Sequence, residues 1–103
     1  MELPSHGEIE EALKRLLKAR NNTPVSASQA YDLLAEIFKL DGGQVALKID
    51  TADGRESAWH NRCRTARGHL VKSGVLNQLP FDTWSLTPSA LKGLAASPEE
   101  LGL

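Results

Sequence analysis

The sequence has little cysteine, few aromatic residues and no long apolar run. Cys63 is the only cysteine among 103 residues, so no disulfide can form within the chain and we expect a reducing compartment. No apolar run approaches the roughly 18 residues of a membrane span, and the first residues lack the basic and apolar regions of a secretory signal. These absences argue against a disulfide-stapled scaffold and a membrane protein, and they predict a cytoplasmic protein.

The chain is short and its composition is ordinary. With 41% hydrophobic and 24% charged side chains over 103 residues, it suffices for one modest core that needs neither a disulfide nor a metal. We therefore expect a single domain over residues 1–103.

Positive charge is concentrated in one segment. From Arg55 to Lys72, five basic side chains stand against one acid, Glu56, although the whole chain has a net charge of −1. The remaining residues carry 7 basic and 12 acidic groups, a net charge of −5. Such asymmetry gives one face that attracts a polyanion on an otherwise repulsive surface. A solvated helix face whose arginines pair with acids such as Asp32 and Glu36 fits the charge pattern equally well.

The basic segment also has helical periodicity. At about 100° per residue, its apolar side chains fall within an arc of roughly 60°, so we expect that side to face a core. They are Trp59, Cys63, Ala66 and Leu70. The opposite arc and its margins carry groups that suit phosphates and base edges. These candidate DNA-binding residues are His60, Asn61, Arg64, Thr65, Arg67, Gly68 and Lys72.

The candidate residues have different expected roles. Arginine pairs with guanine and asparagine with adenine through two hydrogen bonds. We expect phosphate contacts from Arg64, Arg67 and Lys72, and positions near base edges for Asn61, Thr65 and His60. A glycine inside a helix costs about 1 kcal/mol relative to alanine, so Gly68 suggests the close approach of a backbone, from protein or DNA. Each cation has a structural alternative, and Lys72 can simply complement the helix dipole.

Arg62 is expected to have a structural role. It lies about 70° from the centre of the apolar stripe, at its edge, which favours a half-buried arginine over a base contact. We expect its guanidinium to pair with a carboxylate of the second helix.

The remaining chain predicts further elements. A capping box of Ser5 and Glu8 opens a first helix that ends near residues 20–22, and residues 23–25 form a short extended connection. Ser26 or Ser28 caps a second helix that runs to about Leu40, where Asp41-Gly42-Gly43 stops it. Residues 41–57 read as an irregular loop or a short helical turn.

After the basic helix, Gly74 is a natural first residue beyond the helix end. Residues 75–79 and 83–86 then predict a β-hairpin around Pro80-Phe81-Asp82, and Thr87-Pro88 predicts a last helix through Leu91 and Leu94. Helix, strand, helix, loop, helix, hairpin, helix is the order of a winged helix-turn-helix. The expected fold class is α+β, mostly α with a small β-hairpin wing.

The segment Asn61-Arg62-x-x-x-Ala66-Arg67-x-x-Leu70-x-Lys72-x-Gly74-x-Leu76, followed by Trp84-x-Leu86-Thr87, resembles the N-terminal domain of Mrr-type restriction endonucleases. The resemblance covers residues 61–94, about a third of the chain. It implies a winged helix that delivers a nuclease domain to modified or otherwise marked DNA. Asn61, Arg64, Thr65, Arg67 and Lys72 match its DNA-facing positions, whereas Ala66, Leu70, Gly74 and Leu76 match packing positions.

The wing departs from that family. Residues 79–84 contain one acid and no basic residue, where family members often carry arginine or lysine before the tryptophan. Phosphate contacts from the wing are therefore not expected. Phe81 at its tip suggests instead a groove wedge or a partner contact.

Catalytic and metal sites are not expected. His60, Cys63 and His69 do not supply the four ligands of structural zinc. Asp50, Asp53 and Glu56 lie in an expected loop, without the sheet and nearby lysine of a carboxylate nuclease. Gly42-Gly43 lacks the context of a phosphate-binding loop. We expect no enzyme activity and no cofactor.

The sequence therefore predicts a domain that binds double-stranded DNA, plain or modified, as the targeting module of a restriction system. The alternative is a winged helix used for protein contact or a dimerising transcriptional regulator, since the wing is acidic and the terminal helices can form an interface. No membrane contact is expected.

Overall fold

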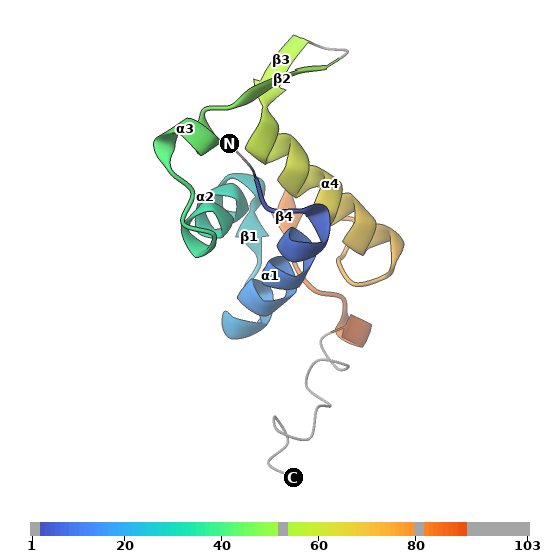
Figure 1. The fold of residues 1–103 in the computed structure, drawn as a ribbon. Helices are drawn as coiled ribbons and strands as arrows, with labels where there is room; N and C mark the ends of the chain where they lie inside the picture. The colour runs from blue at the N-terminus through green and yellow to red at the C-terminus, as the bar shows by residue number, and fades with distance from the viewer. Residues whose placement is uncertain (1–2, 52–53, 80–81, 91–103) are drawn as a thin grey trace.

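The computed structural model describes residues 3–51, 54–79 and 82–90. They form an α+β domain, as expected, in which helices surround a small inner sheet (Figure 1). The helices are α1 (His6–Ala19), α2 (Ala27–Ile37), α3 (Gly42–Val45) and α4 (Ala58–Lys72). The strands are β1 (Val25–Ser26), β2 (Lys48–Thr51), β3 (Gly54–Ser57) and β4 (Thr83–Trp84).

Both α1 and α2 begin with a capping box. The Ser5 hydroxyl accepts from the Glu8 amide at 3.2 Å, and the Glu8 carboxylate accepts from the Ser5 amide at 3.1 Å. At α2, Ser26 rather than Ser28 is the cap, because its hydroxyl and the Gln29 side chain make the same reciprocal pair. These bonds satisfy amides that a helix start otherwise leaves unpaired.

The end of α2 differs from the prediction. The helix stops at Ile37, before Leu40, because Lys39 adopts a left-handed conformation with φ 53°. The Leu40 amide then donates back to the Ala35 carbonyl at 3.0 Å, which closes the last turn. Asp41 does not only follow a helix end: its side chain caps α3 by accepting from the Gln44 amide at 2.8 Å.

The inner sheet joins segments far apart in the chain. Strand β1 pairs antiparallel with β4, so that Val25 lies opposite Trp84, and both side chains are buried. The predicted hairpin between residues 75–79 and 83–86 is confirmed in part, since residues 75–77 do pair antiparallel with the segment after β4, whereas the pairing of β4 itself with β1 was not predicted. Residues 75–79 contribute only one bridge, from Leu76 to Leu86, and flanking hydrogen bonds. Burial of the large Trp84 indole against the helices favours pairing with β1.

Strands β2 and β3 form an outer hairpin that precedes α4 directly and projects beyond its first turn (Figure 1). The short helical turn expected as one alternative in residues 41–57 is present as α3, but the hairpin that follows it was not expected. Asp50 and Glu56 consequently lie on strands, whereas Asp53 lies outside the described residues. Among the described residues, no third strand joins the sheet of this hairpin.

One core lies between α1, α2, α4 and the inner sheet. The apolar stripe predicted for α4 is confirmed, since all four of its members are buried. Gly74 follows the helix end with φ 81°, as expected. Buried core residues are Ile9, Leu13, Leu17, Val25, Ala30, Tyr31, Leu34, Trp59, Cys63, Ala66, Leu70, Leu76, Trp84 and Leu86.

The start of the last helix is present. Residues 88–90 are helical, and the Thr87 hydroxyl accepts from the Ala90 amide at 3.2 Å, as an N-cap does. Leu91 and Leu94 lie outside the described residues, as does Phe81 at the wing tip. Within the described ranges, none of the helices combines the length and apolar character needed to cross a bilayer.

Candidate nucleic-acid interface

The position of helix α4 is set by its buried side and by its N-cap. The Ser57 hydroxyl caps the helix by accepting from the His60 amide at 3.2 Å. The Trp59 indole lies in the core and its Nε1 donates to the Tyr31 carbonyl at 2.9 Å. These contacts set the rotation of α4, so the opposite side, which we call the outer face, points away from the core. Its residues are His60, Asn61, Arg64, Thr65, Gly68 and Lys72.

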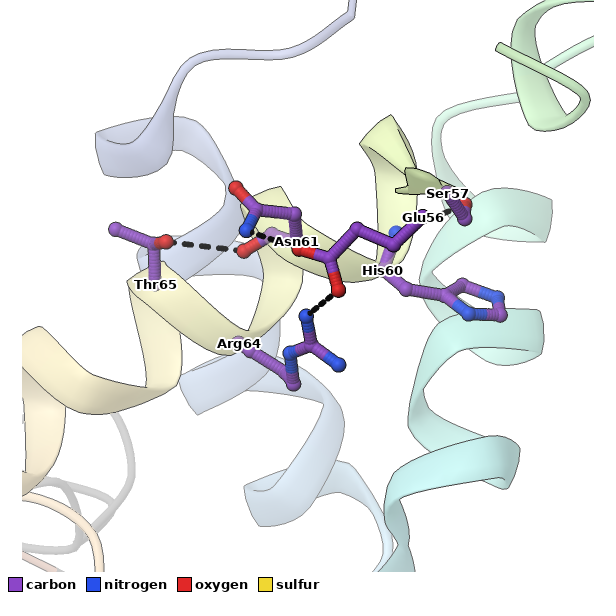
Figure 2. Close-up of polar contacts among 6 residues, drawn as sticks. All are labelled: Glu56, Ser57, His60, Asn61, Arg64 and Thr65. Carbon is purple, nitrogen blue, oxygen red and sulfur yellow. Dashed lines mark hydrogen bonds and ion pairs between the residues drawn. The ribbon is translucent and has the colours of Figure 1, made fainter. Parts of the chain in front are cut away.

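Glu56 on β3 holds two of the outer-face residues. Its Oε1 accepts from the Asn61 side-chain amide at 2.6 Å, and its Oε2 accepts from an Arg64 guanidinium nitrogen. Figure 2 shows the Glu56 carboxylate between these two groups. The hydrogen bond from Arg64, followed by that from Asn61, lowers the pKa of Glu56 below its usual range. The same bond raises the pKa of Arg64, so the pair is charged at neutral pH.

Arg67 corrects the sequence prediction. It was expected at the margin of the DNA-facing arc, but it is only 7% exposed. One guanidinium nitrogen donates to the Gln78 carbonyl at 2.7 Å and to the Asn77 carbonyl at 3.4 Å. Residues 77 and 78 follow α4 and fold back over it, so this cation holds the chain after the helix in place. We therefore remove Arg67 from the candidate DNA-facing residues.

Arg62 has the structural role that was expected, with a different partner. The side chain is partly buried, and its guanidinium donates to the Pro4 carbonyl at 3.2 Å. The predicted pairing with a carboxylate of α2 is wrong in this respect. The residue instead ties the segment before α1 to α4.

Gly68 lies on the outer face and is not required there by packing within the described chain. A Cβ atom built at this position meets no heavy atom within 4 Å. The backbone is helical, so no left-handed conformation explains the glycine. The cost of about 1 kcal/mol for glycine in a helix is therefore not offset by contacts of the described residues.

Lys72 and Thr65 complete the outer face. Lys72 is exposed in the last turn of α4, where its charge also suits the helix dipole. The Thr65 hydroxyl donates to the Asn61 carbonyl at 3.0 Å within the helix (Figure 2), which leaves its oxygen able to accept.

His60 packs sideways on α2. Its ring stacks on Tyr31 with centroids 4.1 Å apart and planes inclined by 15°. Burial against α2, together with the charge of Arg64, lowers the pKa of His60. The neutral form of this imidazole is therefore favoured more than that of an unperturbed histidine.

A pocket of about 300 Å³ opens beside the outer face, between α4, the start of α2 and the approach to β4. It is lined by Ala27, Tyr31, Arg64, Arg67, Gly68, Asp82 and Trp84. Gly68 and Arg64 thus belong both to the outer face and to the wall of this pocket. Its aromatic residues, Tyr31 and Trp84, are almost entirely buried.

Glu56 and Tyr31 belong to this site although the sequence did not predict them there. Glu56 was expected in a loop, because residues 41–57 gave no clear strand pattern. The turn signal at residues 51–54 was the available sign of a hairpin. Tyr31 lies within the expected second helix, and nothing in the sequence indicates its stacking with His60.

The described residues contain no group of three histidine, cysteine, aspartate or glutamate side chains that could hold a metal ion. Cys63 is fully buried, and this burial raises its pKa to about 12. A thiol in that state is a poor nucleophile at neutral pH.

Comparison of the chain with known protein families, curated proteins and solved structures found no match. A function is therefore inferred from the geometry of α4 and its surroundings.

Proposed function

We propose that this domain binds double-stranded DNA with the outer face of α4. The single observation that carries the proposal is the combination of exposed Arg64 and Lys72 with Gly68, whose Cβ position is open. Cations supply the phosphate contacts that dominate affinity for DNA. The glycine lets a nucleic-acid backbone or base edge approach the helix closely. Such an approach would offset the lower helix stability of glycine relative to alanine.

The proposed docking places α4 in the major groove. Asn61 and Arg64 lie within one turn of each other near the helix start, where a recognition helix contacts base edges. The Asn61 amide suits adenine, whereas the Arg64 guanidinium suits a nearby phosphate. Lys72, about two turns further on, is positioned for a phosphate. The pairing of β1 with β4 and the helix order are compatible with a winged helix, which we propose as the fold type.

The test is a titration of a labelled duplex of about 20 base pairs, read by fluorescence anisotropy over a range of salt concentrations. We expect wild-type affinity to fall steeply with salt, since each neutralised phosphate adds about 0.9 to the logarithmic slope. Replacing Arg64 and Lys72 by alanine together should lower the slope by about 2 and weaken binding to every duplex.

A matched control removes two exposed cations elsewhere. Arg15 on α1 and Arg20 at its end are both exposed and belong to no part of the outer face. The Arg15→Ala, Arg20→Ala variant changes the net charge equally and should leave the salt slope unchanged. Equal losses of affinity in both double variants would show that only the net charge matters. Unchanged affinity in the Arg64, Lys72 variant would contradict the proposal.

The role in a restriction system is a further proposal, supported by the resemblance to Mrr-type N-terminal domains. It predicts preferential binding to a duplex that carries a modified base. A comparison of duplexes with cytosine, 5-methylcytosine and 5-hydroxymethylcytosine at matched positions tests this. Equal affinities would leave duplex binding intact and contradict the reading of modified DNA.

Protein contact is the second candidate, favoured by one observation. A groove of about 820 Å³ runs along α1 and the end of α2, with an apolar wall that includes Ala12, Leu16 and Phe38. Ile37 at its side is 48% exposed. Light scattering of wild type and Ile37→Glu tests for a dimer that uses this groove. A monomeric wild type would remove that form of the alternative.

A further inference from the structure

An acid beside the outer face contacts two of the groups proposed to bind DNA. Glu56 comes from β3, outside α4, and each of its carboxylate oxygens is occupied by one of the two, Asn61 or Arg64 (Figure 2). The Arg64 side chain remains 46% exposed and that of Glu56 29% exposed, so solvent reaches the pair. An exposed ion pair of this kind is weak enough for a competing acceptor to exchange with it.

The outer hairpin holds the backbone of Glu56 next to the outer face. Glu56 pairs in the hairpin with Ile49, and the next residue, Ser57, is the N-cap of α4. The backbone of Glu56 is thus held by the strand register on one side and by the helix start on the other. Its carboxylate is therefore placed within hydrogen-bond reach of Asn61 and Arg64.

We propose that Glu56 is a specificity-determining residue of the outer face. It competes with DNA phosphates for Arg64 and with base acceptors for Asn61, so only a DNA site that offers both groups good acceptors at once displaces it. The carboxylate also repels a phosphate that approaches Arg64 alone, which disfavours binding to arbitrary DNA. This inference depends on the proposed function and adds the reason for selectivity to it.

The hairpin offers a matched control. Asp50 lies on β2, its side chain is 88% exposed, and it pairs with Arg55 rather than with α4. The substitutions Glu56→Gln and Asp50→Asn remove the same charge from the same hairpin. Only Glu56→Gln releases Arg64. Glutamine keeps the size of the side chain and an oxygen that can accept from Asn61.

The experiment titrates a labelled random-sequence duplex with wild type, Glu56→Gln and Asp50→Asn across salt concentrations. Glu56→Gln should tighten binding about 2- to 5-fold, the range that corresponds to loss of an exposed ion pair. The salt slope should steepen by about 0.9, because Arg64 gains a phosphate contact. Asp50→Asn should change neither beyond the small effect of net charge. In a background with Arg64→Ala, the gain from Glu56→Gln should disappear.

Three results overturn the inference while leaving duplex binding intact. The first is equal behaviour of Glu56→Gln and Asp50→Asn, and the second is a gain that persists without Arg64. Weaker binding by Glu56→Gln also overturns it, because Glu56 would then support the bound state. If neither wild type nor Glu56→Gln binds the duplex at low salt, the proposed function and the inference fail together.

Discussion

The two small sheets of this domain differ in what holds them together. Strands β1 and β4 are two residues each, yet they pair across almost 60 residues of chain and bury Val25 and Trp84 in the core. Strands β2 and β3 are four residues each and neighbours in sequence, yet their described side chains are exposed or half-buried. An isolated two-stranded hairpin is marginally stable in water. Burial of side chains, rather than strand length, therefore determines which sheet contributes more to the stability of the domain.

This contrast extends to α4, whose buried side belongs to the inner sheet and core, whereas its outer face adjoins the outer hairpin. Changes in the inner region should lower the free energy of unfolding and affect DNA only through the loss of folded protein. Changes in the outer region should alter DNA binding and leave the fold in place. The following substitutions test this division, from the largest expected effect to the smallest.

Replacing Trp84 by alanine should give the largest effect. Its indole is 1% exposed and packs edge-on against Tyr31, with ring centroids 5.7 Å apart. We expect a loss of about 3–5 kcal/mol in the free energy of unfolding, measured by urea denaturation. Ile49→Ala in the outer hairpin, where the side chain is 37% exposed, should cost about 1 kcal/mol or less. Similar costs at both positions would break the comparison.

Asn22 sharpens the comparison, because its side chain links the end of α1 to the inner sheet region. Its oxygen accepts from the Leu86 amide at 2.7 Å and its nitrogen donates to the Leu86 carbonyl at 3.2 Å. Asn22→Gly should cost about 1–3 kcal/mol by leaving the Leu86 backbone without this partner. Glycine also accepts the left-handed backbone found here, φ 57°.

Asn22→Asp is the matched control for that measurement. Aspartate keeps the acceptor for the Leu86 amide, but it turns a carboxylate oxygen towards the Leu86 carbonyl, to which Asn77 still donates. Because the Leu86 amide keeps its acceptor, aspartate should destabilise less than glycine does in the same urea titration. A larger loss in the aspartate variant would contradict the assignment of the main effect to the amide of Leu86.

Gly68→Ala should separate stability from binding. Alanine is favoured by about 1 kcal/mol in a helix interior, and a Cβ here meets no heavy atom of the described chain within 4 Å. We expect a higher unfolding free energy together with weaker duplex binding, measured by denaturation and anisotropy on the same preparation. A stabilised variant with unchanged affinity would show that nothing approaches α4 closely at this point.

His60, at the boundary between the two regions, should give a small pH effect. Its pKa in the folded state is lowered by burial from the ordinary value of 6.5, so the unfolded chain binds the proton more readily. The contribution to stability is complete above pH 6.5 and is lost as the pH falls from there towards the lowered pKa. Urea titrations between pH 7 and 5 should show declining stability, and His60→Asn should reduce the slope. An equal slope in that variant would assign the effect to other groups.

Much of the fold could be predicted because local chemistry determines it. The capping boxes at Ser5 and Ser26, and the inward side of α4, follow from residues within a few positions of each other. The partner of β4 could not be predicted in this way. Residues 75–79 are close in sequence and suggest a local hairpin, but burial of Trp84 against β1 depends on the packing of all the helices.

The candidate site was predictable only in part for the same reason. Helical periodicity places Arg64 and Lys72 on the outer face, and the structure leaves both exposed. Periodicity places Arg67 at the margin of that arc. It does not say whether a side chain at the margin faces solvent or is covered by another segment, and here residues 77 and 78 cover it. The contact of Glu56 with Asn61 and Arg64 depends on the outer hairpin, whose strands have weak alternation.

The pairing of Val25 with Trp84 has a consequence for synthesis of the protein. On the ribosome, α1 and α2 emerge long before the strand that completes the inner sheet, so the apolar groups destined for the core remain uncovered in the nascent chain. The inner sheet cannot form until the chain as far as Leu86 has left the exit tunnel. Truncation ahead of that point should yield a chaperone-dependent polypeptide, even though every residue of the outer face has already been translated.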